Sequence, residues 1–244
     1  MKAIETRELT KQYGKITAVH SLNLSVEEGE LFALLGVNGA GKTTTIRMLT
    51  GLSAPTFGTA TVCGKSVNTQ SSEIKNEIGI STQDTAVAEK LTVLENLEFM
   101  AGIRRNLNKK EQKQSAEEMI HMFHMEEVQN RLAKKLSGGW QRKLSIAMAL
   151  IGQPKVLFLD EPTLGLDVLA RRELWKIIRE LKGKTTIVLT THYMEEAQEL
   201  ADRIGVMVHG EMITVGTLHE LEEQTGKKGL EEVFISLAEG RECV

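Results

Sequence analysis

The sequence has few aromatic residues, few cysteines and no excess of basic charge. Aromatic side chains make up 4% of its 244 residues, which argues against a platform for stacking nucleic-acid bases. Lys and Arg number 30 against 33 Asp and Glu, so the basic surplus typical of nucleic-acid binders is missing. The two cysteines, Cys63 and Cys243, form neither a disulfide framework nor a zinc pattern, and we interpret them as incidental thiols.

Long apolar runs and targeting segments are also missing. No apolar stretch reaches the roughly 18 residues that a membrane helix needs. The charged start MKAIETRELTKQYG does not have the pattern of a signal peptide. We therefore expect a soluble, cytoplasmic protein, whose role at a membrane would come through a partner. A hydrophobic content of 41% suffices for an ordinary core.

The order of the predicted elements indicates an α/β fold. Alternating patterns over AIETREL and SLNLSVEEGE predict half-buried strands, whereas LFALL (31–35) and KVLFLDE (155–161) contain unbroken apolar runs typical of fully buried strands. Further strands are expected over 78–82 and 185–192, helices over 43–50, 167–181 and 193–201, and a hairpin at His209–Gly210. Residues 92–135 read as an all-helical insert, with helix starts at Thr92 and Asn108.

A glycine-rich segment follows LFALL. It fits the pattern G-x-x-x-x-G-K-[ST] through four residues: Gly36, Gly41, Lys42 and Thr43. Glycines let backbone N–H groups wrap around a phosphate, and the following helix presents its positive N-terminus to the anion. Lys42 can reach the β- and γ-phosphates, and the Thr43 hydroxyl can ligate Mg²⁺. The segment predicts nucleotide binding, although kinases, GTPases, helicases and transport ATPases all use it.

Two acidic residues end the strand KVLFLDE. Asp160 and Glu161 emerge at its carboxyl end, where open α/β sheets bind ligands. We predict that Asp160 holds Mg²⁺ through water and that Glu161 orients and deprotonates an attacking water. The alternative is that both acids only cap the following segment. The sequence lacks the N-K-x-D motif with which GTPases recognise the guanine base, which argues against a GTPase.

A second candidate anion site lies in LSGGWQRKLSIAMAL (136–150). Ser137, Gly138 and Gly139 stand at the start of a predicted helix, and such a helix start binds anions. One nucleotide cannot easily engage both glycine-rich elements of a single chain if they lie on different lobes. A head-to-tail dimer would place each nucleotide between the first element of one chain and the LSGG of the other.

With these motifs in this order, the sequence resembles the nucleotide-binding subunit of ABC (ATP-binding cassette) transporters over residues 3–237. The resemblance implies a P-loop NTPase core, a mostly parallel sheet flanked by helices, with an N-terminal antiparallel β subdomain and an all-helical insert. Within a single nucleotide-binding domain, it implies an ATP-binding core with the β subdomain at 1–83 and 154–216. A helical subdomain with the LSGG motif is expected at 84–153 and a helical tail at 217–244.

The resemblance also implies roles for individual residues. Tyr13 resembles the aromatic that stacks on adenine, and Asp167 resembles a residue of the dimer seam. Contacts with ATP are implied for Gly36, Asn38, Gly39, Ala40, Gly41, Lys42, Thr43 and Thr44, and in trans for Ser137, Gly138 and Gly139. Catalytic roles are implied for Glu161, His192, Gln83 and Lys42, and Mg²⁺ contacts for Thr43, Gln83 and Asp160. Trp140 departs from the glutamine common at its position, which leaves the phosphate contacts untouched.

The resemblance predicts a subunit that binds and hydrolyses ATP with Mg²⁺ and powers transport through a separate integral membrane subunit. It would dimerise on ATP binding, with itself or a related ATPase, lie on the inner face of the cell membrane and bind no nucleic acid. GLEEVFISL (229–237), TTTIRMLTGL and EPTLGLD resemble the drug-export branch. One alternative is a soluble ABC ATPase acting on nucleic acid or the ribosome. Another is a regulatory module that binds ATP without hydrolysing it, against which Glu161 and His192 argue.

Overall fold

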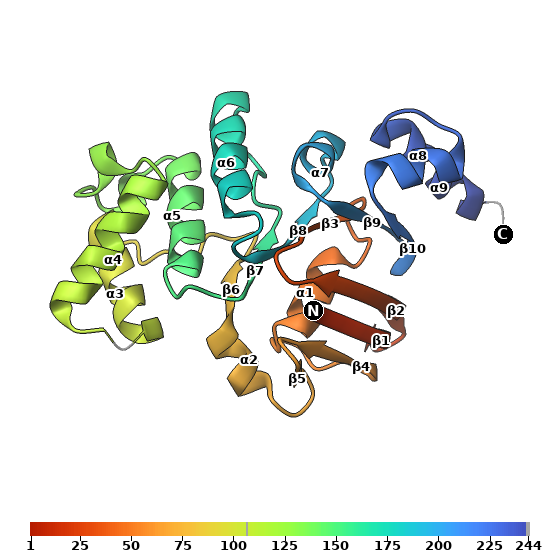
Figure 1. Ribbon diagram of the computed structural model, residues 1–244, viewed down its shortest axis with the longest axis horizontal. Helices are drawn as coiled ribbons and strands as arrows, with labels where there is room; N and C mark the ends of the chain where they lie inside the picture. Colours follow the sequence, from red (N-terminus) through yellow and green to blue (C-terminus); the bar gives the residue numbers. More distant parts are fainter. Residues whose placement is uncertain (106, 243–244) are drawn as a thin grey trace. The chain divides into compact units, whose positions relative to one another are not determined.

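The computed structural model describes residues 1–105 and 107–242 (Figure 1), so Cys243 lies outside the described residues. The chain divides into two compact units, the first comprising residues 1–75 and 182–244 and the second residues 76–181. Cys63, in the first unit, is half-buried.

An antiparallel sheet forms the first part of unit 1. Its strands are β1 (Lys2–Tyr13), β2 (Ile16–Glu27), β4 (Phe57–Val62) and β5 (Lys65–Ser66), in the order β2-β1-β4-β5. The strands predicted over AIETREL and SLNLSVEEGE are confirmed. Their alternation is imperfect because the register between β1 and β2 shifts between Thr6 and Leu9, and Glu8 takes a left-handed φ of 48° there. Helix α1 (Lys42–Leu49) packs against β2 and β4.

The second sheet region of unit 1 is centred on β3 (Leu31–Leu35), all of whose residues are buried. Its neighbours β8 (Thr186–Thr191) and β9 (Arg203–Val208) run parallel to it, and β10 (Glu211–Gly216) pairs antiparallel with β9. The predicted hairpin turns at His209 and Gly210, with φ of 48° and 84°. Helix α7 (Met194–Leu200) packs on β3 and β8, and α8 (Leu218–Thr225) and α9 (Leu230–Glu242) follow.

Unit 2 contains the parallel pair β6 (Ile78–Ser81) and β7 (Val156–Asp160), with α5 (Gly138–Leu150) packed against both. Helices α3 (Val93–Arg105) and α4 (Lys109–Met122) lie side by side (Figure 1), and two 3-10 turns, Glu126–Val128 and Ala133–Lys135, complete the expected helical insert. Helix α6 (Val168–Leu181) follows β7. The predicted helix starts are confirmed, because Thr92 exchanges hydrogen bonds with Glu95 and Asn108 caps α4.

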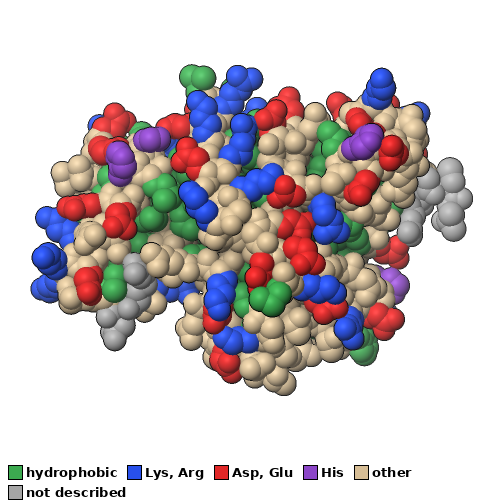
Figure 2. All heavy atoms as spheres, in the orientation of Figure 1, with side chains coloured by type: hydrophobic (Ala, Val, Ile, Leu, Met, Phe, Trp, Pro, Cys, Tyr) green, Lys and Arg blue, Asp and Glu red, His purple; other side chains and the backbone are tan. Residues whose placement is uncertain are grey.

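Helix α2 (Ser71–Glu77) and strand β5 were not predicted. Within residues 1–105 and 107–242, none of the helices combines the length and the apolar character of a membrane span. Figure 2 shows acidic and basic side chains interspersed on the visible face rather than separated by sign.

Candidate functional site

The segment that joins β3 to α1, here called the phosphate loop (residues 36–43), is packed too tightly to carry side chains at two of its glycines. A Cβ atom at Gly36 would lie 2.4 Å from the carbonyl oxygen of Met207. At Gly41, whose φ is 101°, it would lie 2.5 Å from the carbonyl oxygen of Ala18. Real Cβ atoms do not approach backbone oxygens so closely, so both positions require glycine. The pattern of glycines in the sequence therefore has a direct steric cause.

Backbone hydrogen bonds fix the phosphate loop at Gly36 and at Ala40. The N–H of Gly36 donates to the carbonyl of Thr191 at 3.2 Å, and the N–H of Gly210 donates to the carbonyl of Ala40 at 3.1 Å. Strand β8 and the β9–β10 turn thus hold the loop from two sides. A loop held in this way presents its N–H groups without further ordering, which is the requirement for a pre-formed anion site.

The side chain of Lys42 contacts the backbone of the phosphate loop. Its ammonium nitrogen donates to the carbonyl oxygens of Gly36 at 2.7 Å and Val37 at 3.2 Å, and the residue is 5% exposed. Asn38 and Gly39, at the apex, are exposed. The loop therefore has a buried cationic base and an open rim. Thr43 and Thr44 are half-buried in the first turn of α1.

His192 and Tyr13 belong to the same unit as the phosphate loop. Leu35 and Thr191 are register partners in the parallel pair of β3 and β8, so His192 and the loop leave the sheet at the same edge. The His192 ring lies 4.1 Å, centre to centre, from the ring of Tyr193, tilted by 41°. Tyr13 ends β1, is 47% exposed and has the Lys11 ammonium 5.1 Å from its ring centre. An exposed ring of this kind is available for stacking.

The two acids lie at the end of β7 in unit 2. Asp160 and Glu161 are 3% and 5% exposed. Glu161 has a left-handed φ of 50°, a strain of about 1–3 kcal/mol of the kind that clusters at functional sites. Its carbonyl accepts from the N–H of Leu164 at 3.2 Å, which closes a tight turn. Helix α6 is capped by Asp167, whose Oδ1 accepts the N–H groups of Leu169 and Ala170, each at 2.9 Å.

Gln83 follows β6, which runs parallel to β7 with Ser81 opposite Leu159. Gln83 and the two acids therefore leave neighbouring strands at the same edge. The backbone before and at Gln83 is anchored by Arg142, which donates to the carbonyls of Thr82 at 2.7 Å and Gln83 at 2.6 Å. The sequence alone indicates no role for Arg142. Only a tertiary contact reveals what this side chain holds.

The LSGG segment (residues 136–139) leads into α5. Ser137 and Gly138 are exposed, and Ser137 makes no side-chain capping bond to the helix. A Cβ atom at Gly139 would lie 3.7 Å from the Cβ of Ala170 and 3.8 Å from Cδ2 of Leu166. The first turn of α5 therefore rests on the start of α6, next to Asp167. The LSGG segment, predicted to contact the partner's nucleotide, and Asp167, predicted to lie at the dimer seam, are therefore neighbours in unit 2.

The residues predicted from sequence thus gather in four places. In unit 1 the phosphate loop and His192 share a strand edge, and Tyr13 lies at the end of β1. In unit 2 Gln83 shares a strand edge with Asp160 and Glu161, and the LSGG segment lies beside Asp167. In the described part of the chain, no three His, Cys, Asp or Glu side chains form a ready-made metal cluster.

Comparison with known proteins identifies the family. The family model described as ABC transporter matches residues 19–164. The daunorubicin/doxorubicin resistance ATP-binding protein DrrA of Streptomyces peucetius is 43% identical over 230 residues, which are 94% of this chain and 69% of that protein. The probable multidrug ABC transporter ATP-binding protein YbhF of Escherichia coli (strain K12) is 38% identical over 240 residues, which are 96% of this chain and 41% of that protein.

A solved structure supports the same assignment. The dimeric post-hydrolysis state of the ATP-binding cassette MJ0796 bound to ADP and Pi superposes with a TM-score of 0.81 at 27% identity, covering 88% of this chain and 98% of that one. The predicted fold, a P-loop core with an antiparallel β part and a helical insert, is thereby confirmed. The chain belongs to the ABC transporter family, among its ATP-binding subunits.

Proposed function

We propose that this chain binds ATP at the phosphate loop, hydrolyses it, and uses the cycle to drive export through a separate membrane subunit. The observation that carries the proposal is the loop itself. Gly36 and Gly41 leave no room for a Cβ, and Lys42 is buried with its ammonium against the loop carbonyls. Such a site suits a polyphosphate, because backbone N–H groups and one fixed cation meet several oxygens at once.

The proposed chemistry assigns one task to each group. Backbone N–H groups of residues 38–44 and the Lys42 ammonium hold the β- and γ-phosphates. A water oxygen forms a bond to the γ-phosphorus while the bond from that phosphorus to the bridging oxygen breaks, so that ADP leaves and phosphate forms. Glu161 accepts the proton of this water. His192 and Gln83 contact the γ-phosphate and the water, and Tyr13 stacks on the adenine.

Mg²⁺ fits the donors that the sequence offers. The hydroxyl of Thr43 and the amide oxygen of Gln83 would contact the ion, and the carboxylate of Asp160 would hold it through water. Mg²⁺ prefers oxygen donors and is usually bound by few protein groups together with substrate phosphates. When bound, the ion would neutralise charge on the phosphates.

We propose that two copies, or one copy and a related ATPase, close on ATP, with Ser137, Gly138 and Gly139 reaching the partner's nucleotide and Asp167 at the seam. The dimeric state of the MJ0796 cassette supports this arrangement. DrrA and YbhF are named for drug resistance and multidrug transport, which supports export as the direction and a partner at the inner face of the cell membrane.

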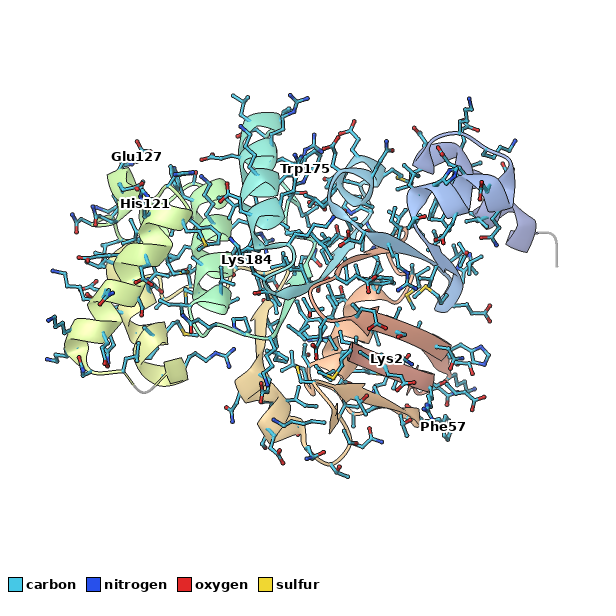
Figure 3. All side chains as sticks on the ribbon, viewed as in Figure 1. Lys2, Phe57, His121, Glu127, Trp175 and Lys184 are labelled. Carbon is cyan, nitrogen blue, oxygen red and sulfur yellow. The ribbon has the colours of Figure 1, made fainter. Side chains whose placement is uncertain are left out.

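The partner surface is proposed to include α3 and the residues before it, 91–103. Phe99 and Ile103 on this helix are 56% and 62% exposed. Large apolar side chains exposed on neighbouring turns are typical of surfaces that another protein covers. Phe57 on β4, 62% exposed (Figure 3), offers a matched control in the other unit.

The test is a pull-down from gently solubilised membranes with ATP and Mg²⁺, using a tagged Glu161→Gln protein that retains nucleotide. We expect a multi-span membrane protein that is lost in Lys42→Ala and in Phe99→Asp but kept in Phe57→Asp. Recovery of ribosomes or DNA-bound proteins without a membrane protein would contradict the transport proposal. It would leave the ATPase assignment in place, and steady-state phosphate release by the unmodified chain tests that assignment separately.

A further inference from the structure

Trp140 immediately follows the LSGG segment and forms a contact with a buried cation. The ammonium nitrogen of Lys143 lies 4.4 Å from the centre of the Trp140 ring. The two residues are three positions apart on α5, so they lie on one face of the helix. Lys143 is 5% exposed. An ammonium removed from water needs compensation, and the electron-rich face of an indole supplies part of it.

The rest of the compensation comes from the neighbouring helix. Glu173 on α6 places its Oε1 2.7 Å from the Lys143 ammonium, and the side chain of Lys143 is 6% exposed against 43% for Glu173. The cation is therefore enclosed between an indole of α5 and a carboxylate of α6. Because Lys143 is buried and Glu173 is not, removing the Glu173 carboxylate would leave the buried ammonium of Lys143 poorly compensated.

A second contact joins the same two helices one turn earlier. Gly139 faces Ala170 and Leu166. A Cβ atom on Gly139 would be in van der Waals contact with both, 3.7 Å from the Cβ of Ala170 and 3.8 Å from Cδ2 of Leu166. Asp167 caps α6 directly beside this contact. The starts of α5 and α6, side by side in Figure 1, are thus held together at the glycine contact and at the enclosed ammonium.

We propose that Trp140, Lys143 and Glu173 are positioning residues that fix the LSGG segment relative to Asp167, so that the two elements meet a second copy of the chain as one rigid edge. This inference rests on the proposed ATP-dependent dimer. The LSGG segment and Asp167 belong to different helices but would contact one partner surface. If their spacing were not fixed in the monomer, ordering them during association would lower the affinity of the dimer. The enclosed ammonium fixes that spacing without touching nucleotide.

The test uses the Glu161→Gln background and compares two quantities in each protein. One is the dissociation constant of the ATP-bound dimer, measured by sedimentation. The other is the affinity of the monomer for a fluorescent ATP analogue at protein concentrations below dimerisation. Glu173→Gln and Trp140→Leu should each raise the dimer dissociation constant about tenfold or more, because each removes one side of the enclosure. Monomer affinity should stay within about twofold, since neither Trp140 nor Glu173 is among the residues proposed to hold the nucleotide of their own chain.

Two further variants separate positioning from general damage. Trp140→Phe keeps an aromatic face for the ammonium and should restore dimerisation to within about threefold of the parent. Glu180→Gln, on the exposed end of α6, should behave as the parent does. Circular dichroism and thermal unfolding verify that each protein is folded.

The outcomes distinguish this inference from the function on which it depends. If the Glu161→Gln parent dimerises with ATP and the Glu173→Gln and Trp140→Leu proteins dimerise equally well, the positioning role is wrong and the dimer stands. If the parent binds ATP but remains monomeric at every concentration, the proposed dimer is wrong and this inference falls with it. A parallel loss of monomer ATP affinity in the variants would also overturn the positioning role.

Discussion

The guanidinium of Arg142 donates a hydrogen bond of 2.6 Å to the backbone carbonyl of Gln83. Its other terminal nitrogen donates at 2.7 Å to the carbonyl of Thr82, and the residue is 4% exposed. Two nitrogens in one rigid plane hold the two successive carbonyls in a fixed geometry, which the single, freely rotating ammonium of a lysine does not reproduce. One side chain of the helix that follows the LSGG segment therefore holds the backbone that carries Gln83.

Replacing Arg142 with lysine is expected to lower the kcat of ATP hydrolysis about tenfold, because Gln83 loses its fixed backbone. The free energy of unfolding should fall by about 1.5–3 kcal/mol, the range for a hydrogen bond to a charged group. Measurements of phosphate release against ATP concentration and of denaturant unfolding check both effects. Ser145→Ala is the matched control, since it removes a neutral hydrogen bond of 2.9 Å between Ser145 and Ser81, worth about 1 kcal/mol. An unchanged kcat in Arg142→Lys would contradict the link between the two residues.

Glu161→Gln should separate binding from hydrolysis. The amide keeps the shape of the side chain but cannot accept a proton from water, so we expect hydrolysis to slow by about 10²–10⁴-fold. ATP affinity should change little, because the phosphates are held by the phosphate loop. Single-turnover hydrolysis and equilibrium binding provide the two numbers. Glu180→Gln, an exposed change on α6, should leave both intact. Hydrolysis at the parent rate in Glu161→Gln would remove the proposed base.

Gly36→Ala tests the steric argument for the phosphate loop. The added Cβ would meet the carbonyl oxygen of Met207 at 2.4 Å, so the backbone must shift, at a cost of about 1–3 kcal/mol. For a chain of this size, each kcal/mol lowers Tm by about 2–4 °C. Gly138→Ala, whose Cβ would meet nothing within 4 Å, should change the free energy of unfolding by less than about 1 kcal/mol. Equal stabilities for the two variants would mean that the loop can relax around a side chain.

The strands of the fold could be predicted where burial is continuous or alternates over several residues. LFALL and VLFLD are buried at every position, and this kind of strand has an unmistakable apolar pattern. Helix α2 was missed because SSEIKNE contains a single buried residue, Ile74, so no helical period is visible. The bulge at Glu8 was also invisible, since its N–H is held by the side chain of Asn23 on another strand. The division into core, helical subdomain and tail at the predicted boundaries stays a prediction.

The candidate site could be predicted to the extent that its chemistry is local. Phosphate binding needs adjacent glycines, a lysine and a hydroxyl, so residues 36–43 carry the pattern in one stretch. Arg142, Lys143 and Glu173 carry no such pattern, because their contacts join segments far apart in the sequence. A buried arginine and a buried lysine look in the sequence like ordinary polar residues of a helix. The roles of the predicted site residues stay predictions until the variants above are measured.

The start of α3 allows a prediction about pH. The Glu95 carboxylate accepts hydrogen bonds from the backbone N–H of Thr92 at 2.7 Å and from its hydroxyl at 2.9 Å. The backbone bond first, and the hydroxyl second, lower the pKa of Glu95 below its ordinary value of 4.5. Because the folded pKa is the lower one, the stabilisation is complete above about 4.5 and is lost as the pH falls through the folded pKa.

Thr92→Ala removes the hydroxyl and keeps the backbone N–H. We expect the pKa of Glu95 to rise toward its ordinary value but to remain below it, because the larger of the two causes persists. A carbon-13 NMR titration of the side-chain carboxyls measures this directly. Glu220, whose pKa is lowered by the equivalent bonds from Thr217 at the start of α8, is the internal control and should titrate identically in both proteins. A Glu95 midpoint that does not move in Thr92→Ala would show that the hydroxyl contributes nothing to the lowered pKa, and that the backbone N–H alone holds the carboxylate.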